Sequence, residues 1–170
     1  MKNILSGCLI LALISCNSPK AEDFREKIDG QELVAFHIVA GKDGYESKKL
    51  ESLLDEDYDG ALKAVDQKSK AFDMIIFDIK KMQTMNVDEA LTLKDAVINY
   101  YEALKKLHAS DRKEISQQLK AKNVDSSQLP SEQKTLLNIY REKKSFYEDV
   151  YQQESLYSEA KRKFDEANGL

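Results

Sequence analysis

Apolar side chains recur every three or four residues along most of the chain, and this spacing predicts long amphipathic helices. The pattern holds over about 57–83, 87–122 and 131–167. Only six glycines and two prolines occur among 170 residues, so few positions interrupt helices of this length. No stretch shows the alternating pattern of a strand between turn residues. The sequence therefore predicts an all-α protein.

The predicted stripes mark the faces that would turn toward a core. The stripe of the second helix comprises Leu62, Val65, Ser69, Phe72, Ile76, Ile79 and Met82. The stripe of the third comprises Leu93, Val97, Tyr100, Leu104, Leu107, Asp111, Ile115 and Gln118. The stripe of the fourth comprises Leu136, Tyr140, Lys143, Tyr147, Val150, Glu154, Tyr157, Ala160, Phe164 and Ala167.

A first helix is expected over 22–40, where the sequence "GKDG" (41–44) ends it, and a short helical piece follows over 45–54. Asn86 has the chemistry of an N-cap for the third helix, and Pro130 marks the start of the fourth. Short loops between long helices favour antiparallel neighbours. We therefore expect an up-down-up-down four-helix bundle. A three-helix bundle with a loosely packed first segment is the alternative.

The N-terminal sequence "MKNILSGCLILALISC" predicts a signal peptide. Lys2 precedes an apolar run over 4–14, which is shorter than the ~20 residues that a membrane-spanning helix needs. The run ends in "LISC", which resembles the bacterial lipobox. That resemblance implies cleavage after residue 15 and acylation of Cys16. The predicted organisation is a signal peptide (1–15), a lipidated cysteine with a polar tether (16–21) and a helical domain (22–170). A plain secretory peptide cut elsewhere, or an uncleaved anchor, is the alternative.

Cleavage after residue 15 would leave a mature chain without a second thiol, because Cys8 and Cys16 are the only cysteines. A disulfide, a cysteine-ligated zinc site and a cysteine nucleophile are then excluded. Several acyl chains anchor a protein far more firmly than one does. The residue after Cys16 is Asn17. An Asp at this position would resemble an inner-membrane retention signal, and its absence favours the outer membrane. The expected location is its periplasmic face or the cell surface.

Three stretches resemble a family of small helical bacterial surface lipoproteins: "FDIKKMQTM" (77–85), "LKDAVINYYEALKKL" (93–107) and "YREKKSFYEDVYQQESLYSEAKRKF" (140–164). The resemblance covers nearly all of the mature chain, although its motifs are degenerate. It implies a four-helix domain at the envelope and no particular activity.

Enzyme motifs such as HExxH, GxSxG and the P-loop are missing, so we expect no catalytic activity. The net charge of −4 gives a nucleic-acid partner no support. Two histidines, His37 and His108, would ligate haem only if they faced one another. The ordinary alternative is that one histidine is partly exposed and the other caps a helix or extends its ring nitrogen to the surface. Neither has a Glu three residues earlier, as di-iron bundles require.

The stretch "DEDYDGALKAVD" (55–66) has the spacing of an EF-hand calcium loop, with Asp55, Asp57, Asp59 and Asp66 as ligands. The twelfth position is Asp rather than Glu, and the helical stripe already begins at Leu62. We therefore favour an acidic helix start over a Ca²⁺ site.

Tyrosines are concentrated on the third and fourth predicted helices: Tyr100, Tyr101, Tyr140, Tyr147, Tyr151 and Tyr157. They would line the edge of the bundle or form a groove for a partner. Basic clusters at 105–106, 112–113 and 161–163 are interspersed with acids, which is typical of solvated faces. The favoured hypothesis is a lipid-anchored, non-enzymatic interaction or structural module with an envelope protein partner. The alternative is a ligand- or metal-binding lipoprotein that holds Ca²⁺ at 55–66.

Overall fold

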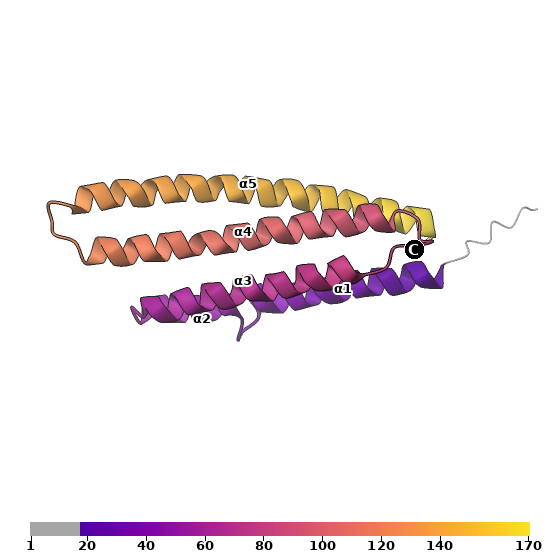
Figure 1. The fold of residues 1–170 in the computed structure, drawn as a ribbon, viewed down its shortest axis with the longest axis horizontal. Coiled ribbons are helices and arrows are strands. Elements are labelled where there is room, and N and C mark those ends of the chain that lie inside the picture. The colour runs from indigo at the N-terminus through magenta and orange to yellow at the C-terminus, as the bar shows by residue number, and fades with distance from the viewer. Residues whose placement is uncertain (1–17) are drawn as a thin grey trace, which may run out of the picture.

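The computed structural model describes residues 18–170 as five helices and their connections (Figure 1). The helices are α1 (Pro19–Ala40), α2 (Tyr45–Leu54), α3 (Tyr58–Lys81), α4 (Ala90–Lys122) and α5 (Leu129–Asn168). The all-α prediction is confirmed. Because α1 and α2 form one interrupted arm, four helical arms pack in sequence, which is consistent with an up-down bundle. The predicted signal peptide and Cys16 lie outside the described residues.

The interruption between α1 and α2 lies at the predicted "GKDG" sequence. A Cβ atom at Gly41 would lie 2.4 Å from the backbone oxygen of His37, and one at Gly44 would lie 2.8 Å from the same oxygen. Only glycine allows the chain to pass so close to the end of α1. α2 then packs mainly on α3.

The predicted cap of the third helix is wrong. The N-cap of α4 is Glu89, with φ 57°, and the helix has no acid in its first turn. Asn86 lies three residues earlier in the loop, with φ 61°. Asn tolerates the left-handed region better than most residues, so Asn86 helps to reverse the chain instead of capping the helix.

The main hydrophobic core lies toward the end of the molecule where α1 begins and α5 ends. Phe24 packs on Phe164 with ring centroids 5.5 Å apart, and Phe72 packs on Tyr101 at 6.3 Å. Ile28 of α1 is fully buried in the same cluster, so the alternative of a loosely packed first segment is wrong.

The opposite end of the molecule is thinner. Figure 1 shows the hairpin of α4 and α5 extending beyond α2 and α3. The first buried residue of α5 is Val150, so the first half of this helix has no fully covered side chain. None of the helices among residues 18–170 combines the length and hydropathy needed to cross a bilayer.

Candidate functional site

The acidic stretch 55–66 forms the end of α2 and the start of α3. Asp57 is the N-cap of α3, and its Oδ1 accepts a hydrogen bond from the Gly60 backbone N–H at 2.9 Å. A Cβ atom at Gly60 would lie 2.0 Å from the other oxygen of that carboxylate, so the glycine makes room for the cap. The predicted helix start is confirmed.

Helical geometry separates the four carboxylates that a Ca²⁺ loop would bring together. Nine residues of helix from Asp57 to Asp66 span about 13 Å, whereas Ca²⁺ ligands lie within ~2.6 Å of one ion. Asp66 instead accepts two hydrogen bonds from Arg112, at 2.6 and 2.7 Å. Asp55 is the C-cap of α2, and Asp59 lies in the first turn of α3. In this conformation the stretch caps a helix.

The two histidines lie in different surroundings. His37 is exposed on α1. His108 is largely buried, with its ring stacked on Phe72 at 5.6 Å between centroids. Its Nδ1 lies 3.0 Å from Nζ of Lys68. Burial and then the Lys68 charge lower the pKa of His108 to about 4, so the ring is neutral at pH 7. A haem held between these two side chains has no support in this arrangement.

A buried ionic cluster surrounds His108 and joins four helices. Its charged members are Glu46 and Lys49 of α2, Lys68 of α3, Asp111 and Glu114 of α4, and Lys143 of α5. Asp111 accepts from Lys49 and from Lys143, each at 2.6 Å. Lys68, with no exposed surface, donates to Glu46 at 2.5 Å. The cluster therefore ties α2, α3, α4 and α5 together halfway along the molecule.

Three ammonium groups balance three carboxylates in this cluster. Burial raises the pKa of Asp111, but hydrogen bonds and charge from Lys143 and Lys49 outweigh it and hold the pKa below its usual value. Burial lowers the pKa of Lys68 more than its bond to Glu46 raises it. Glu46, His108 and Asp111 each offer one possible metal-ligand atom, and these three atoms lie within 4.8 Å of one another. A metal ion there would have to displace lysines, so the cluster is suited to holding helices together.

Sequence reasoning missed this cluster, although a signal was present. Asp111 and Lys143 both occupy stripe positions that should face the core, and opposite charges at such positions indicate a buried pair. Lys68 gave no such signal, because the stripe was placed on its neighbour Ser69. In the structure, Lys68 is fully buried, whereas Ser69 is only partly buried.

The tyrosines divide into an inner and an outer group. Tyr101 and Tyr157 are buried, and Tyr100 packs against both rings. The outer group, Tyr140, Tyr147 and Tyr151, is between 42% and 67% exposed. Lining of the bundle accounts fully for the inner group, and the outer group lies at its edge.

The outer tyrosines belong to one stripe on α5, which we call the α5 stripe: Leu137, Tyr140, Lys144, Tyr147 and Tyr151. Spacings of three, four, three and four residues place these side chains on one face of the helix. The apolar members are between 42% and 67% exposed, and Tyr140 also accepts a 3.5 Å hydrogen bond from Gln118 on α4. Exposed apolar side chains that share one helix face are candidates for a binding site.

Farther along α5, the same series meets α1 only at Lys161. The residues between, Glu154 and Ser158, are exposed, whereas Nζ of Lys161 lies 2.9 Å from a carboxylate oxygen of Glu32 on α1. A groove of about 490 Å³ lies beside these residues and is lined by α1, α4 and α5, including Phe36, Tyr100 and Glu154. The α5 stripe therefore leads toward the contact between α5 and α1.

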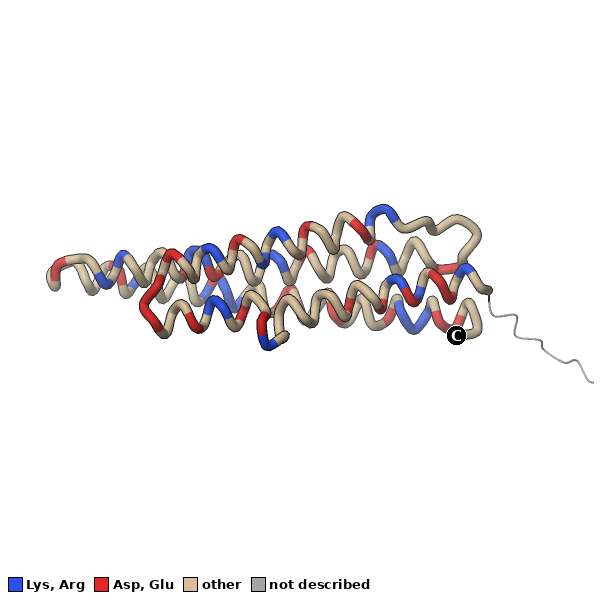
Figure 2. Tube along the Cα trace, turned by 90° about the horizontal axis from the view of Figure 1, so that it is seen from below, with Lys and Arg blue, Asp and Glu red and all other residues tan. Residues whose placement is uncertain are grey.

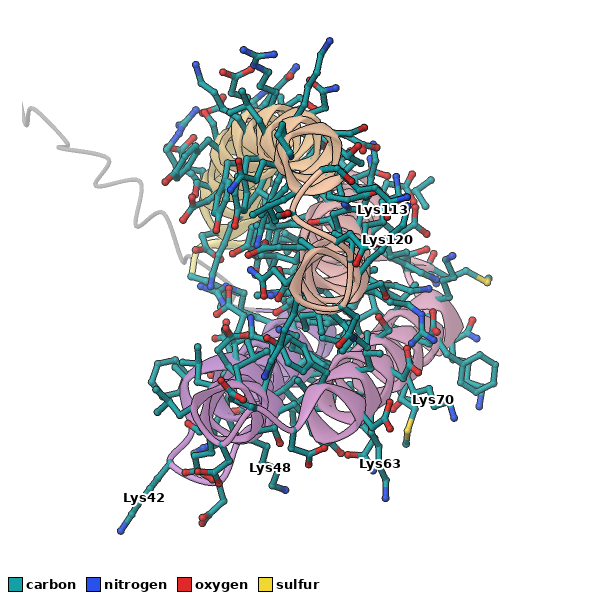
Figure 3. All side chains as sticks on the ribbon, turned by 90° about the vertical axis from the view of Figure 1, so that its left-hand side faces the viewer. Lys42, Lys48, Lys63, Lys70, Lys113 and Lys120 are labelled. Carbon is teal, nitrogen blue, oxygen red and sulfur yellow. The ribbon has the colours of Figure 1, made fainter. Side chains whose placement is uncertain are left out.

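The remaining charged surface shows no face of one sign. Figure 2 shows acidic and basic residues alternating along the helices. The predicted basic clusters contain residues paired with acids, such as Lys105 with Asp73 and Lys113 with Glu142. In Figure 3 the labelled lysines of α2 and α3, Lys48, Lys63 and Lys70, point away from the bundle. This mixed surface matches the predicted solvated faces.

Comparison with models of known protein families, with curated proteins and with solved structures gave no match for this chain. The helical domain that the lipoprotein resemblance implied is present, but the family is not identified.

Proposed function

We propose that this protein is a lipid-anchored, non-enzymatic interaction module of the bacterial outer membrane. It binds a helical segment of an envelope protein through the α5 stripe. The observation that carries the proposal is the row of apolar side chains from Leu137 to Tyr151, which are spaced as for helix packing yet are between 42% and 67% exposed within the described chain.

A helix is the partner that best fits this surface. α1 meets the continuation of the same face at Lys161, so a helix following the direction of α1 would lie along the stripe. The fifteen residues from Leu137 to Tyr151 span about 21 Å, which corresponds to about four turns of a partner helix. Lys144 lies in the middle of the stripe, so an acidic residue at the matching position of the partner would be favoured.

The anchor rests on the N-terminal sequence. Lys2, the short apolar run and the lipobox-like "LISC" support acylation of Cys16 and retention at the outer membrane, on its periplasmic face or at the cell surface. A non-enzymatic role is supported by the missing catalytic motifs and by the buried ionic cluster, whose carboxylates already have ammonium partners.

Site-specific photo-crosslinking in intact cells tests the binding surface. A benzophenone amino acid replaces Tyr147 in one variant and Phe77 in the control, because Phe77 is a similarly exposed aromatic residue on α3. We expect an adduct of one defined mass from position 147 and not from 77. The adduct should disappear when Leu137→Glu and Tyr151→Glu are added, and the crosslinked partner peptide should map to an amphipathic helix. Equal crosslinking from both positions, or none from 147, would refute the α5 stripe as the binding surface.

The anchor is tested separately by mass spectrometry of the mature protein and by fractionation of Cys16→Ala cells. An acylated N-terminal cysteine and loss of the variant from the membrane fraction are the expected results. An unmodified Cys16, or an N-terminus elsewhere, would refute the anchor and leave the crosslinking result standing.

A further inference from the structure

A very short connection joins Cys16 to the first turn of α1. α1 begins at Pro19, so only Asn17 and Ser18 separate it from the cysteine. The three residue steps from Cys16 to Pro19 reach at most about 11 Å in an extended chain. If Cys16 carries the proposed lipid anchor, the first turn of α1 must lie close to the lipid headgroups. The same end contains the loop between α3 and α4, which connects 81 to 90, and the end of α5 (Figure 1).

Large apolar side chains are exposed at this end. Met85 in the loop is 75% exposed, and Leu91 in the first turn of α4 is 59% exposed. The C-terminal Leu170 is exposed as well. Figure 2 shows the first part of the loop as a stretch without charge, directly after the basic end of α3. A methionine on a loop adapts readily to an irregular apolar environment.

The loop that presents Met85 is fixed in place. Nζ of Lys94 donates to the backbone oxygens of Lys80 and Met82, at 2.6 and 2.8 Å. On its other side, Nδ2 of Asn168 donates to the backbone oxygen of Asp88 at 2.9 Å. These bonds hold the loop against α4 and α5, so the exposure of Met85 is a feature of the folded end.

A hollow of about 670 Å³ separates the loop from α1, and lysines stand around it. Within residues 18–170, neither Lys20 nor Lys81 forms an ion pair, whereas Lys27 pairs with Asp23 at 2.5 Å. Asp78 also lines the hollow, and Asp88 and Glu89 lie at the end of the loop, so the net charge of this end does not favour anions. Nζ of Lys81 lies over the ring of Phe77, 3.8 Å from its centroid. Ammonium groups beside apolar side chains fit the boundary between lipid phosphates and acyl chains.

We propose that this end of the bundle docks on the bilayer that holds the acyl chains of Cys16. Met85 and Leu91 enter the boundary between headgroups and acyl chains, and Lys20 and Lys81 contact lipid phosphates. The inference rests on the proposed anchor. Its consequence is orientation: the bundle stands away from the membrane, with Tyr151 about 25 Å and Leu137 about 45 Å from the docked end, counted along α5 from Asn168.

Tryptophan fluorescence with brominated lipids tests the docking, because the chain has no tryptophan of its own. Met85→Trp and the control Leu137→Trp each introduce one fluorophore at an exposed position at opposite ends of the molecule. Each full-length, acylated variant is reconstituted in vesicles of phosphatidylcholine and phosphatidylglycerol, with and without bromine on the acyl chains. Circular dichroism melting confirms that both variants fold.

We expect bromine to lower the emission of Met85→Trp roughly twofold and to leave Leu137→Trp unchanged, since a docked side chain reaches the edge of the acyl region. Adding Lys20→Gln and Lys81→Gln should weaken the quenching at position 85. Absence of quenching at 85 in vesicles that hold the acylated protein would overturn the inference, as would equal quenching at both positions. Mass spectrometry of the same sample separates this failure from failure of the anchor, because an unacylated chain refutes the anchor instead.

Discussion

Asp111 should be the most sensitive charged residue of the fold. It is 4% exposed and accepts hydrogen bonds from Lys49 and Lys143, each at 2.6 Å. Asp111→Asn keeps the shape of the side chain and removes its charge, so two lysines lose their shared carboxylate. A hydrogen bond to a charged group contributes about 1.5–3 kcal/mol. Breaking a buried ion pair by removing one partner costs about 3–5 kcal/mol, and we expect a loss in that range.

The matched control is Asp66→Asn, which breaks the pair with Arg112. The distance is the same, 2.6 Å, but both side chains are about half exposed, and such pairs contribute only about 0–1 kcal/mol. Both variants are unfolded with urea and heat. Since 1 kcal/mol shifts the Tm of a domain of this size by about 2–4 °C, Asp111→Asn should lower Tm by roughly 10 °C. If it lowers stability no more than Asp66→Asn does, the ionic cluster does not hold the helices together as argued.

Three further predictions concern other residues. Because the pKa of His108 falls from about 6.5 in the unfolded chain to about 4 in the folded one, the folded state binds fewer protons between these values. Its contribution to stability is complete above pH 6.5 and is lost toward pH 4. In His108→Gln, the free energy of unfolding measured with urea should therefore depend less on pH between 4 and 6.5. The same dependence on pH as in the original protein would contradict this. Tyr157→Ala should cost about 3–5 kcal/mol and Tyr151→Ala less than about 0.5 kcal/mol in the same measurement, and equal losses would show that the outer tyrosine is also core. Calcium at millimolar concentration should leave Tm unchanged because Asp57 caps α3 and Asp66 pairs with Arg112, and a Tm that rises with calcium would restore the EF-hand interpretation.

The main helices could be predicted because the local geometry of a helix sets the spacing of its apolar residues. The break at Gly41–Gly44, the start of α3 at Asp57 and the stop at Gly169 are local as well, and the sequence indicates each of them. The place of Asn86 in the loop before α4, and the N-cap at Glu89, could not be predicted in this way. A loop that reverses the chain needs left-handed residues, and Asn suits that conformation as well as it suits an N-cap, so composition does not distinguish the two.

The burial of Lys68 depends on contacts that are distant in sequence. Its partner Glu46 lies on α2 and its neighbour His108 on α4, so no local pattern separates it from the solvated lysines of α3 such as Lys63 and Lys70. Lys68 and Ser69 both fit the spacing of three and four residues between Val65 and Phe72, so spacing alone does not choose between them. Only the pairing of charges between stripes, as for Asp111 and Lys143, indicates such a cluster from sequence.

The α5 stripe shows why periodicity alone cannot assign a face to a core. Tyr147 and Tyr157 both belong to the stripe predicted for the fourth helix, yet Tyr147 is exposed and Tyr157 is buried. The difference arises from α1, which covers α5 near Tyr157 and ends at Ala40, after which α2 packs on α3. The sequence contains the break that ends α1 but not the direction that the chain takes afterwards. Because helix spacing is the same toward a core and toward a partner, the exposed half of α5 is the surface on which the proposed partner helix would pack.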